Sequence, residues 1–428
     1  MFLREGGAEA CSRWRESEAR PAQGRREGMR SIGIDWNPSL RCPATGIIAP
    51  MSAPAAPRLV TVDPELPDEA VLAPAAAALA GGALVAFPTE TVYGLGANAW
   101  DAAAVARVFA AKERPFADPL IVHVLDWAAA QALVDPAALA AAAGDEAAPV
   151  ARAARLAAAF WPGPLTLVLP RHPRLPGLVT AGQDSVALRA PAHPVARALL
   201  RLAAVPVAAP SANPFGGISP TRAADVLADL GSKVDWIVDG GAATLGLEST
   251  VVDCRGPRPR VLRPGAVTVE ALREVLPEVL GPDEVGVGAE TASMSAPTAS
   301  PGLMARHYAP RRARVSLFVG APAAQRAAMV ARAVEAADAG RRVALLVPAE
   351  DAADLSAALR DWAARVTVEV LGSRASLAAA AHGLYAALRR LDEAGVDVIL
   401  AADRGVAGLG LALRDRLSRA AEGRVIRV

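Results

Sequence analysis

The sequence predicts a two-domain α/β protein, with a mixed, twisted sheet in a larger first domain and a parallel sheet in a smaller second one. Between residues 59 and 279, short apolar runs are separated by Pro and Gly, and few long helical stretches intervene. Residues 281–301 are rich in Gly, Ser, Thr, Ala and Pro, the composition of a linker. Beyond the linker, apolar runs and helical stretches alternate regularly. Because 428 residues exceed one ordinary core, two domains are expected.

These patterns divide the chain into four regions. They are an N-terminal tail at 1–57, a first domain at 58–280, a linker at 281–312 and a second domain at 313–428. The tail contains Arg25-Arg26, a second methionine at Met51 and no apolar stretch of the signal-peptide kind. We expect this tail to be disordered, or to be a mis-assigned start of the protein.

The composition argues against several classes of protein. The chain carries 45 Lys and Arg against 44 Asp and Glu, whereas sequence-independent nucleic-acid binding requires a basic surplus. Cys11, Cys42 and Cys254 form no CxxC pair, so we expect neither a disulfide framework nor a structural zinc site, and a reducing cytoplasm fits. No uninterrupted apolar run approaches the about 18 residues that a membrane helix needs.

The elements of the first domain follow from apolar runs and the residues that stop them. Residues 83–87 form a buried strand that ends at Pro88. Asp101 is the expected N-cap of a helix, which ends at Arg114-Pro115 because the residue before proline disfavours the α conformation. Further strands are expected at 120–124, 165–169, 186–189, 205–208, 236–238, 250–253 and 261–263.

The second domain reads as a βαβ series. Apolar, β-branched runs alternate with helical stretches, which predicts a parallel, helix-covered sheet of Rossmann type with right-handed crossovers. The strands are expected at 315–319, 343–347, 366–370 and 396–401.

Familiar catalytic motifs are missing from the sequence. It has no GxxxxGK[ST] phosphate loop, no HExxH and no GxSxG. With five histidines in the chain, a cage of several imidazoles is not expected, and we predict no metal site built by the protein. If a nucleotide binds, it binds without a P-loop.

Three arginines share one sequence context. Arg114, Arg189 and Arg263 each end a predicted element, next to or one residue before a proline. A guanidinium at an apolar strand end is costly to bury unless it meets an anion, and it pairs well with phosphates and carboxylates. Lys112 adds a fourth cation beside Arg114. The alternative is three unrelated surface arginines and a lysine that caps a solvated helix end.

Polar residues also follow several of the predicted strands. The loop 88–96 carries threonines and two glycines, which permit close approach of a ligand to the backbone. Ser211-Ala212-Asn213 and the segment 216–219 combine hydroxyl groups with glycines, as phosphate sites do. His123 lies on the face of its strand opposite Leu120, Val122 and Val124. Taken alone, a strand histidine is more often a structural residue than a ligand-binding one, and the other segments are also typical of ordinary turns.

Taken in order, these segments resemble the threonylcarbamoyl-AMP synthase family, whose catalytic unit is the YrdC-like domain. The matching segments are 87–95 (FPTETVYGL), 112–115 (KERP) with 119–123 (PLIVH), 161–166 (WPGPLT), 186–189 (VALR), 209–213 (APSAN), 249–253 (STVVD) and 262–265 (LRPG). Residues 301–310 and the βαβ region resemble the two-domain form of the family, as do Gly408-Leu409-Gly410 and Asp415-Arg416-Leu417. The linker departs from the family pattern, which has a lysine shortly after Pro-Gly, since Leu303-Met304-Ala305 stand there.

The resemblance implies a reaction. Family members condense L-threonine, bicarbonate and ATP to threonylcarbamoyl-AMP, releasing pyrophosphate. A transferase complex then carries the threonylcarbamoyl group to tRNA, so this chain would meet tRNA only indirectly. It would use ATP as substrate, with Mg²⁺, in the cytoplasm and away from membranes.

The resemblance also implies roles for particular residues. Those that would contact threonine are Thr91, His123, Arg189 and Ser249. Those that would contact ATP are Arg114, Ser185, Ser211, Asn213, Ser219, Arg263 and Tyr308, the last as a lid. Lys112, Arg114 and Arg263 would stabilise the charge that builds up during the reaction.

Three other interpretations stay open. The first domain could bind RNA phosphates, although no aromatic-interleaved basic run supports this. It could belong to a carbamoyl transferase of the hydrogenase-maturation type, although the zinc-finger cysteine pairs of such proteins are missing. The second domain, which shows no catalytic set of its own, could be a regulatory or partner-docking module.

Overall fold

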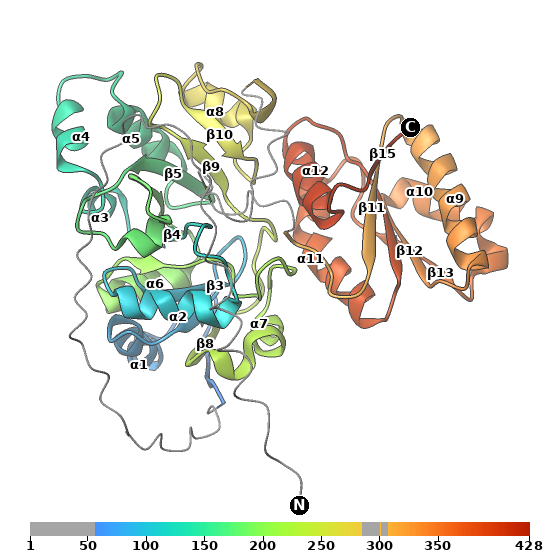
Figure 1. Ribbon diagram of the computed structural model, residues 1–428, viewed down its shortest axis with the longest axis horizontal. Coiled ribbons are helices and arrows are strands. Elements are labelled where there is room, and N and C mark those ends of the chain that lie inside the picture. The colour runs from blue at the N-terminus through green and yellow to red at the C-terminus, as the bar shows by residue number, and fades with distance from the viewer. Residues whose placement is uncertain (1–55, 285–299, 301–306) are drawn as a thin grey trace, which may run out of the picture. The chain divides into compact units, whose positions relative to one another are not determined.

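The computed structural model describes residues 56–284, 300 and 307–428 (Figure 1). The predicted tail at 1–57 therefore falls almost wholly outside the described residues, as does most of the linker, including Leu303-Met304-Ala305. In the described part of the chain, no helix combines the length and the apolar character needed to cross a membrane.

The first domain is built on a ten-stranded sheet in the order β1-β8-β2-β3-β7-β4-β6-β5-β9-β10. Parallel pairs such as β4 with β6 alternate with antiparallel pairs such as β5 with β6, so the predicted mixed sheet is confirmed. The strands are β1 Arg58–Thr61, β2 Val85–Phe87, β3 Gly94–Asn98, β4 Ile121–His123, β5 Leu165–Pro170, β6 Ser185–Arg189, β7 Val207–Ala208, β8 Trp236–Asp239, β9 Thr250–Asp253 and β10 Arg260–Arg263.

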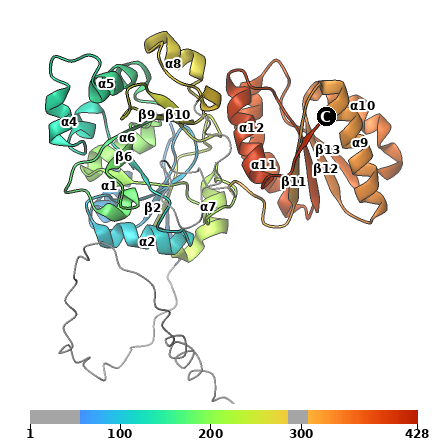
Figure 2. The ribbon, with the colours of Figure 1, turned by 45° about the horizontal axis from the view of Figure 1, so that its top comes forward.

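Helices pack against this sheet. They are α1 Glu69–Ala80, α2 Ala102–Lys112, α3 Trp127–Gln131, α4 Pro136–Ala141, α5 Pro149–Phe160, α6 Pro194–Ala203, α7 Ala223–Leu230 and α8 Val269–Val275, with 3₁₀ turns η1 Gly177–Thr180, η2 Gly231–Lys233 and η3 Pro282–Glu284. Helices α1 and α6 lie side by side and share an apolar cluster with β2 and β8 (Figures 1 and 2). Asp101 caps α2 through hydrogen bonds from the amides of Ala103 and Ala104, as predicted.

Two local predictions for this domain are wrong. Residues 94–96, which we expected in a loop, begin strand β3, because their backbone pairs with β2. The strand predicted at 205–208 is reduced to β7, Val207–Ala208. Helix α1 escaped prediction because its alanines show no apolar stripe and Pro74 lies inside it. Strand β1 escaped because all four of its residues pair with β8, a strand that is distant in sequence, and three of the four are exposed.

The second domain is the predicted parallel sheet, in the order β13-β12-β14-β11-β15. Its strands are β11 Arg314–Val319, β12 Val343–Val347, β13 Val366–Val370, β14 Val398–Ala402 and the unpredicted β15 Val425–Arg427. Its helices are α9 Pro322–Asp338, α10 Ala349–Ala358, α11 Leu377–Glu393 and α12 Leu409–Ala420, with a 3₁₀ turn η4 at Arg360–Trp362. Helices α9 and α10 cover one face of the sheet, and α11 and α12 the other (Figures 1 and 2).

Candidate active site

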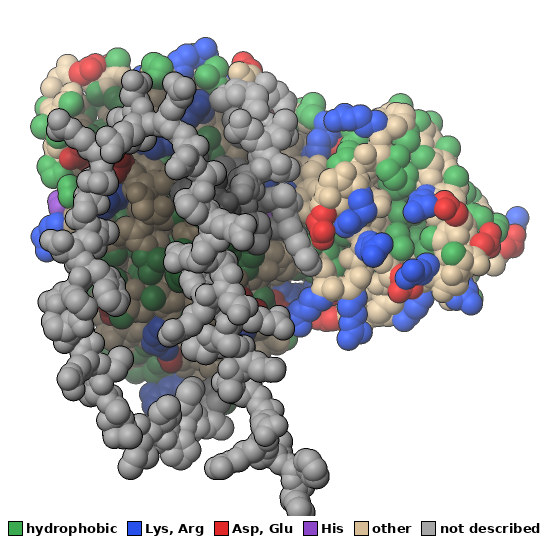
Figure 3. Space-filling model, in the orientation of Figure 1, with side chains coloured by type: hydrophobic (Ala, Val, Ile, Leu, Met, Phe, Trp, Pro, Cys, Tyr) green, Lys and Arg blue, Asp and Glu red, His purple; other side chains and the backbone are tan. Residues whose placement is uncertain are grey.

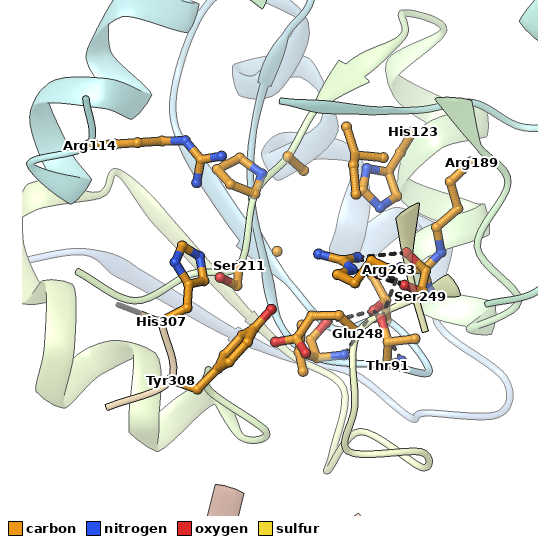
Figure 4. A pocket seen from close by; sticks show the side chains of 16 residues that line it. Thr91, Arg114, His123, Arg189, Ser211, Glu248, Ser249, Arg263, His307 and Tyr308 are labelled. Atoms are coloured by element: carbon orange, nitrogen blue, oxygen red, sulfur yellow. Dashed lines mark hydrogen bonds between the residues drawn. The ribbon is translucent and has the colours of Figure 1, made fainter. Parts of the chain in front are cut away.

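A pocket opens where several strands of the first domain end (Figure 4). It lies outside the ends of β2, β4, β6 and β10 and is closed on one side by His307 and Tyr308 of the linker. Its lining consists of Thr89, Thr91, Val92, Gly94, Arg114, Ile121, His123, Arg189, Ala209, Pro210, Ser211, Glu248, Ser249, Arg263, His307 and Tyr308. The three arginines that share one sequence context therefore meet in a single pocket.

The loop after β2 supplies two hydroxyl groups to this pocket. The Thr89 hydroxyl donates to the carbonyl of Val92 at 2.6 Å and lies 2.8 Å from the Thr91 hydroxyl. The amides of Thr91 and Val92 point back to Thr89 Oγ1 at 3.2 Å. This network holds the loop in one tight turn and presents Thr91 to the pocket.

Arg189, at the end of β6, is buried beside the same loop. Its Nη1 donates to Thr91 Oγ1 at 2.9 Å, and its Nη2 lies 2.7 Å from a Glu90 carboxylate oxygen. The Glu90 pair meets the distance of an ion pair but not the angles of a hydrogen bond, so Nη2 keeps no hydrogen-bonded partner among the described residues. A carboxylate ligand entering the pocket would find this donor.

Arg263 and Ser249 form a second polar unit of the pocket. The Nε and Nη2 atoms of Arg263 donate to the Ser249 carbonyl at 3.1 and 3.0 Å, and Nη2 also reaches the Ser249 hydroxyl at 3.1 Å. That hydroxyl lies 2.7 Å from the hydroxyl of Thr166 on β5. Strands β5, β9 and β10 therefore fix one guanidinium in place through their backbone and side chains.

Arg114 follows α2, after Glu113 turns the chain in the left-handed region at φ 55°. Its side chain forms a buried ion pair with Asp118 at 2.9 Å and donates to the carbonyls of Asp118 and Pro119. Burial lowers the pKa of Arg114, and nearby Asp118 opposes that shift. Because two carbonyls and a carboxylate hold the side chain, its orientation in the pocket is set before any ligand arrives.

His123, on β4, faces the pocket from the side opposite the core residues Val122 and Val124. Burial, followed by the neighbouring charge of Arg189, lowers the pKa of His123 to about 3. Its ring is therefore neutral at physiological pH. Nδ1 is buried and has no partner in the described part of the chain, so it can donate or accept toward a ligand according to tautomer.

Four sequence-predicted residues do not line the pocket. Lys112 is fully buried, and its ammonium nitrogen contacts the carbonyls of Ser211 and Asn213. The amide nitrogen of Asn213 donates to the carbonyls of Pro214 and Gly217, which fixes the turn. The hydroxyl of Ser219 donates to Glu248 at 2.5 Å, and Ser185 is buried at the start of β6. Their geometry places Lys112, Asn213 and Ser219 behind the lining residues, where they support them.

Glu248 carries the one carboxylate among the lining residues, and sequence analysis gave it no role. It accepts hydrogen bonds from Ser219, from the Tyr385 hydroxyl at 2.6 Å and from Arg416 Nε at 2.8 Å. Burial alone would raise the pKa of Glu248, but Arg416, Arg263 and the two hydroxyl donors together hold it below the usual range. The only local sign of Glu248 is that polar residues precede strand β9, and polar residues before a strand are equally typical of an ordinary turn.

Tyr308 closes one side of the pocket beside His307 (Figure 4). It stacks on Tyr385 with ring centroids 5.6 Å apart, and the Arg416 guanidinium lies 5.2 Å from its ring centre. These contacts hold Tyr308 at φ 62°, a region that non-glycine residues seldom adopt. The Tyr308 hydroxyl has no partner among the described residues and lies within the pocket wall.

The described residues contain no group of three or more His, Cys, Asp or Glu side chains that could hold a metal ion. Glu248, the acidic lining residue, is already engaged by Arg416, Ser219 and Tyr385. Cationic and hydroxyl groups thus dominate the pocket, and these groups suit an anionic ligand that brings its own counterion.

The mixed sheet and this pocket define an α/β protein with a basic pocket at the ends of its strands. Residues 77–265 match the family described as "Telomere recombination", and residues 267–422 match the family described as "Threonylcarbamoyl-AMP synthase, C-terminal domain".

Curated relatives agree with these matches. The Bacillus subtilis (strain 168) protein "Threonylcarbamoyl-AMP synthase" is 42% identical over 370 residues, covering 86% of this chain and 96% of the relative. The Pyrococcus abyssi (strain GE5 / Orsay) protein of the same name is 40% identical, covering 81% and 93%. A crystal structure of P. abyssi Sua5 complexed with L-threonine superposes with a TM-score of 0.75 at 38% identity, covering 86% of this chain and 99% of that one. The chain belongs to the threonylcarbamoyl-AMP synthase family.

Proposed function

We propose that this chain is a nucleotidyltransferase that condenses L-threonine, bicarbonate and ATP to threonylcarbamoyl-AMP and pyrophosphate, for threonylcarbamoyladenosine modification of tRNA. The observation that carries the proposal is the convergence of Arg114, Arg189 and Arg263 in one pocket with His123 and several hydroxyl groups. The matches to relatives of that name over most of the chain support it. The similar crystal structure named as a complex with L-threonine supports the choice of amino acid.

The threonine site lies, in this proposal, at the end of the pocket formed by β4, β6 and β9. Arg189 would bind the carboxylate of threonine, because its Nη2 is buried without a hydrogen-bonded partner in the described chain. Thr91 and Ser249 would contact the polar groups of the amino acid, since their hydroxyls are fixed by Arg189 and Arg263. Neutral His123 can accept a hydrogen bond without adding charge.

The nucleotide site lies, in this proposal, at the other end, where Arg114, Ser211 and Tyr308 line the wall. Arg114 would meet phosphate oxygens, and Tyr308 would cover the nucleotide as a lid. Asn213 and Ser219 would act from behind the lining, through the hydrogen bonds that they form. Ser185, buried at the start of β6, would likewise act indirectly. Lys112 would likewise act indirectly, by holding the carbonyls of Ser211 and Asn213.

The reaction needs positioning and charge stabilisation more than covalent help. The threonine amine, once it has lost its extra proton, forms an N–C bond with the bicarbonate carbon while a C–O bond of bicarbonate breaks and water leaves, which gives a carbamate. A carbamate oxygen then attacks the α-phosphorus in line. The α-phosphorus bond to pyrophosphate breaks, and negative charge grows on the departing group. Arg114 and Arg263 are already held by carbonyls and an ion pair, so they meet that charge with little reorganisation. We expect no covalent enzyme intermediate.

Magnesium would arrive with the nucleotide. Because the acidic lining residue Glu248 is occupied by three donors, the pocket offers no spare carboxylate for a protein-held ion. Mg²⁺ commonly binds through substrate phosphates with few protein ligands, and there it neutralises phosphate charge. We further propose a cytoplasmic location and a downstream transferase complex that takes the adenylate to tRNA.

The test is to incubate the purified full chain with ATP, bicarbonate and each amino acid in turn, and to measure pyrophosphate and the adenylate. We expect both products with L-threonine, in equal amounts, and none when bicarbonate is withheld. Pyrophosphate release that ignores threonine, or salt-sensitive RNA binding without any ATP turnover, would contradict the proposal. The Tyr308→Ala variant should lower the yield of adenylate, because the carbamate is labile in water.

A further inference from the structure

A second basic cluster lies in the second domain, at the carboxyl edge of its sheet. Its members come from loops that follow different strands: Arg404 after β14, Arg374 after β13, and Asp351 at the start of α10, after β12. The loops are tied together, because Arg404 Nη2 donates to the carbonyl of Leu371 and the Ala349 amide donates to that of Gly372 at 2.9 Å. Residues distant in sequence thus form one continuous surface.

This edge is where a parallel sheet of this kind leaves a crevice. Strand β12 lies between β13 and β14. From β12 the chain passes to α10 on one face, whereas from β13 and β14 it passes to α11 and α12 on the other (Figures 1 and 2). In open α/β sheets, ligands bind outside the carboxyl ends of strands at such a reversal. The fold therefore places the cluster at a position suited to a ligand.

Arg404 has donors that the protein leaves unused. Its Nε and Nη1 atoms are buried, and neither has a hydrogen-bond partner in the described part of the chain. A buried, charged donor without a partner destabilises the folded state more than a neutral one does. The pKa of Arg404 is lowered to about 10 by burial and then by the adjacent charge of Arg374. The nearby carboxylates of Glu350, Asp351 and Asp403 oppose this shift without overcoming it, and none of them accepts a hydrogen bond from the Arg404 Nε or Nη1 atom.

The neighbouring acidic side chains already have other partners. Asp351 pairs with Arg326 at 2.8 Å and with Arg374. Asp403 pairs with Arg414 and also accepts a hydrogen bond from the Gly405 amide at 3.2 Å. Both oxygens of Glu350 accept hydrogen bonds from the Arg374 amide at 3.0 and 3.1 Å. Arg326, Arg374 and Arg414 each form an ion pair with a carboxylate. Arg404 forms none with the described residues.

The turn after Arg404 leaves room for a ligand. Gly405 and Gly408 have positive φ values of 91° and 54°, and a Cβ built on either would meet nothing within 4 Å. The Gly408-Leu409-Gly410 motif of the sequence opens helix α12 here, and the Gly408 amide donates a long hydrogen bond of 3.4 Å to Glu270. Arg374 lies close enough to Arg404 to lower its pKa, and 38% of its side chain is exposed to solvent. A ligand from solution can therefore reach the cluster at Arg374.

We propose that the second domain binds a phosphate-type oxyanion at the carboxyl edge of its sheet, between Arg404, Arg374 and the turn at Gly405–Gly408. The oxyanion would accept from the unused nitrogens of Arg404 and balance the like charges of the two arginines. The start of α12 would add its amide groups. This site is separate in sequence and in fold from the pocket of the first domain, and its ligand is free phosphate, pyrophosphate or the phosphates of a nucleotide.

The test uses titration calorimetry on the full chain, with inorganic phosphate, pyrophosphate and ATP as separate probes. Because the first-domain pocket also attracts phosphates, all proteins carry Arg263→Ala, and Arg404→Gln or the control Arg341→Gln is added to it. Arg341 is an exposed arginine of the same domain. We expect Arg404→Gln to weaken binding of at least one probe by about tenfold or more, whereas Arg341→Gln leaves it unchanged. The probe that binds most tightly distinguishes the free anion from the nucleotide.

Identical isotherms for the Arg404→Gln and Arg341→Gln proteins with all three probes would overturn the proposal. In the otherwise wild-type chain, Arg404→Gln should keep pyrophosphate release within about twofold of normal, since Arg404 is not part of the reaction pocket. If Arg404→Gln does not fold, the titrations are repeated with Arg404→Lys, and a crystal of the full chain is soaked in phosphate. Phosphate density at Arg404 supports the site, and density confined to the first-domain pocket refutes it.

Discussion

Buried charge is arranged differently in the two domains. In the first domain, Arg114 with Asp118 and Arg189 with Glu90 form ion pairs in which every side chain is less than a tenth exposed. In the second domain, buried Asp351 lies between Arg326 and Arg374, whose side chains are 33% and 38% exposed. Water can take over Arg326 or Arg374 if either loses Asp351, but it cannot take over Arg114 or Arg189. Arg416 is the exception in the second domain, because its side chain is fully buried and pairs with Glu248 of the pocket. The difference indicates that cations at the pocket are fixed in place, whereas solvent reaches the cations around Asp351.

The surface of the second domain supports the same contrast. On the face shown in Figure 3, basic and acidic side chains are interspersed over this domain. That pattern provides solubility and many weak ion pairs, and it offers no broad basic field on this face for a nucleic acid.

The largest expected effect compares one acid from each domain. Asp118→Ala leaves the buried Arg114 guanidinium without its carboxylate, so we expect a loss of about 3–5 kcal/mol in the free energy of unfolding. Asp351→Ala releases arginines that can turn toward water, and the loss should be about 1 kcal/mol. Urea unfolding of the full chain measures both. Equal losses would end the comparison.

The next effect concerns catalysis. Arg263→Ala removes a fixed donor from the pocket, so pyrophosphate release should fall at least about tenfold, a barrier increase of about 1.4 kcal/mol. Arg114→Ala should lower the rate of pyrophosphate release by a similar factor. Arg374→Ala, in the second domain, is the matched control and should retain the wild-type rate. Steady-state assays at saturating ATP distinguish these outcomes, and near-normal turnover in both pocket variants would place the chemistry elsewhere.

A third prediction concerns pH. The pKa of His123 is lowered to about 3 in the folded chain. In the unfolded chain the histidine has its ordinary pKa of about 6.5, so between these two values the unfolded chain binds a proton that the folded chain does not bind. Stability should therefore decrease as pH falls from about 6 to 4, by up to about 1.4 kcal/mol per pH unit from this residue. His123→Gln should flatten the urea-derived stability profile in that window. An unchanged slope would mean that His123 is not held neutral.

The smallest effect concerns substrate binding. Thr91→Val preserves shape but removes the hydroxyl that accepts from Arg189, a hydrogen bond of about 0.5–1.5 kcal/mol. We expect KM for L-threonine to rise up to about tenfold, with a smaller change in kcat. Thr367→Val, at an exposed position of β13, should leave both constants unchanged. A selective decrease in kcat would assign Thr91 to the chemical step instead.

The sequence was informative where one pattern had one structural meaning. The βαβ alternation predicted the parallel sheet of the second domain, and the position of Arg114, Arg189 and Arg263 at element ends predicted a shared basic pocket. Both signals are local, since each depends on a strand or helix and the residue that ends it.

Other features could not be predicted because they depend on contacts between distant segments. Glu248 is held by Tyr385 and Arg416, which are 137 and 168 residues away in the chain, so no local pattern marks it. Similarly, the two glycines that we expected in a loop pair with β2 as part of a strand, and only the sheet partner makes that clear. The cluster around Arg404 joins three loops in the same way.

Lys112 shows how a charged residue can serve as a mechanical tie. Its side chain anchors the last turn of α2 to the carbonyls of Ser211 and Asn213, about a hundred positions further along the chain. Burial holds its pKa well below the usual range, and the neighbouring Arg114 adds to that shift. The helix and the Ser211 segment must therefore move as one piece. A ligand that displaces Ser211 should therefore also displace the last turn of α2. A spectroscopic label on the outer surface of that helix could detect this movement.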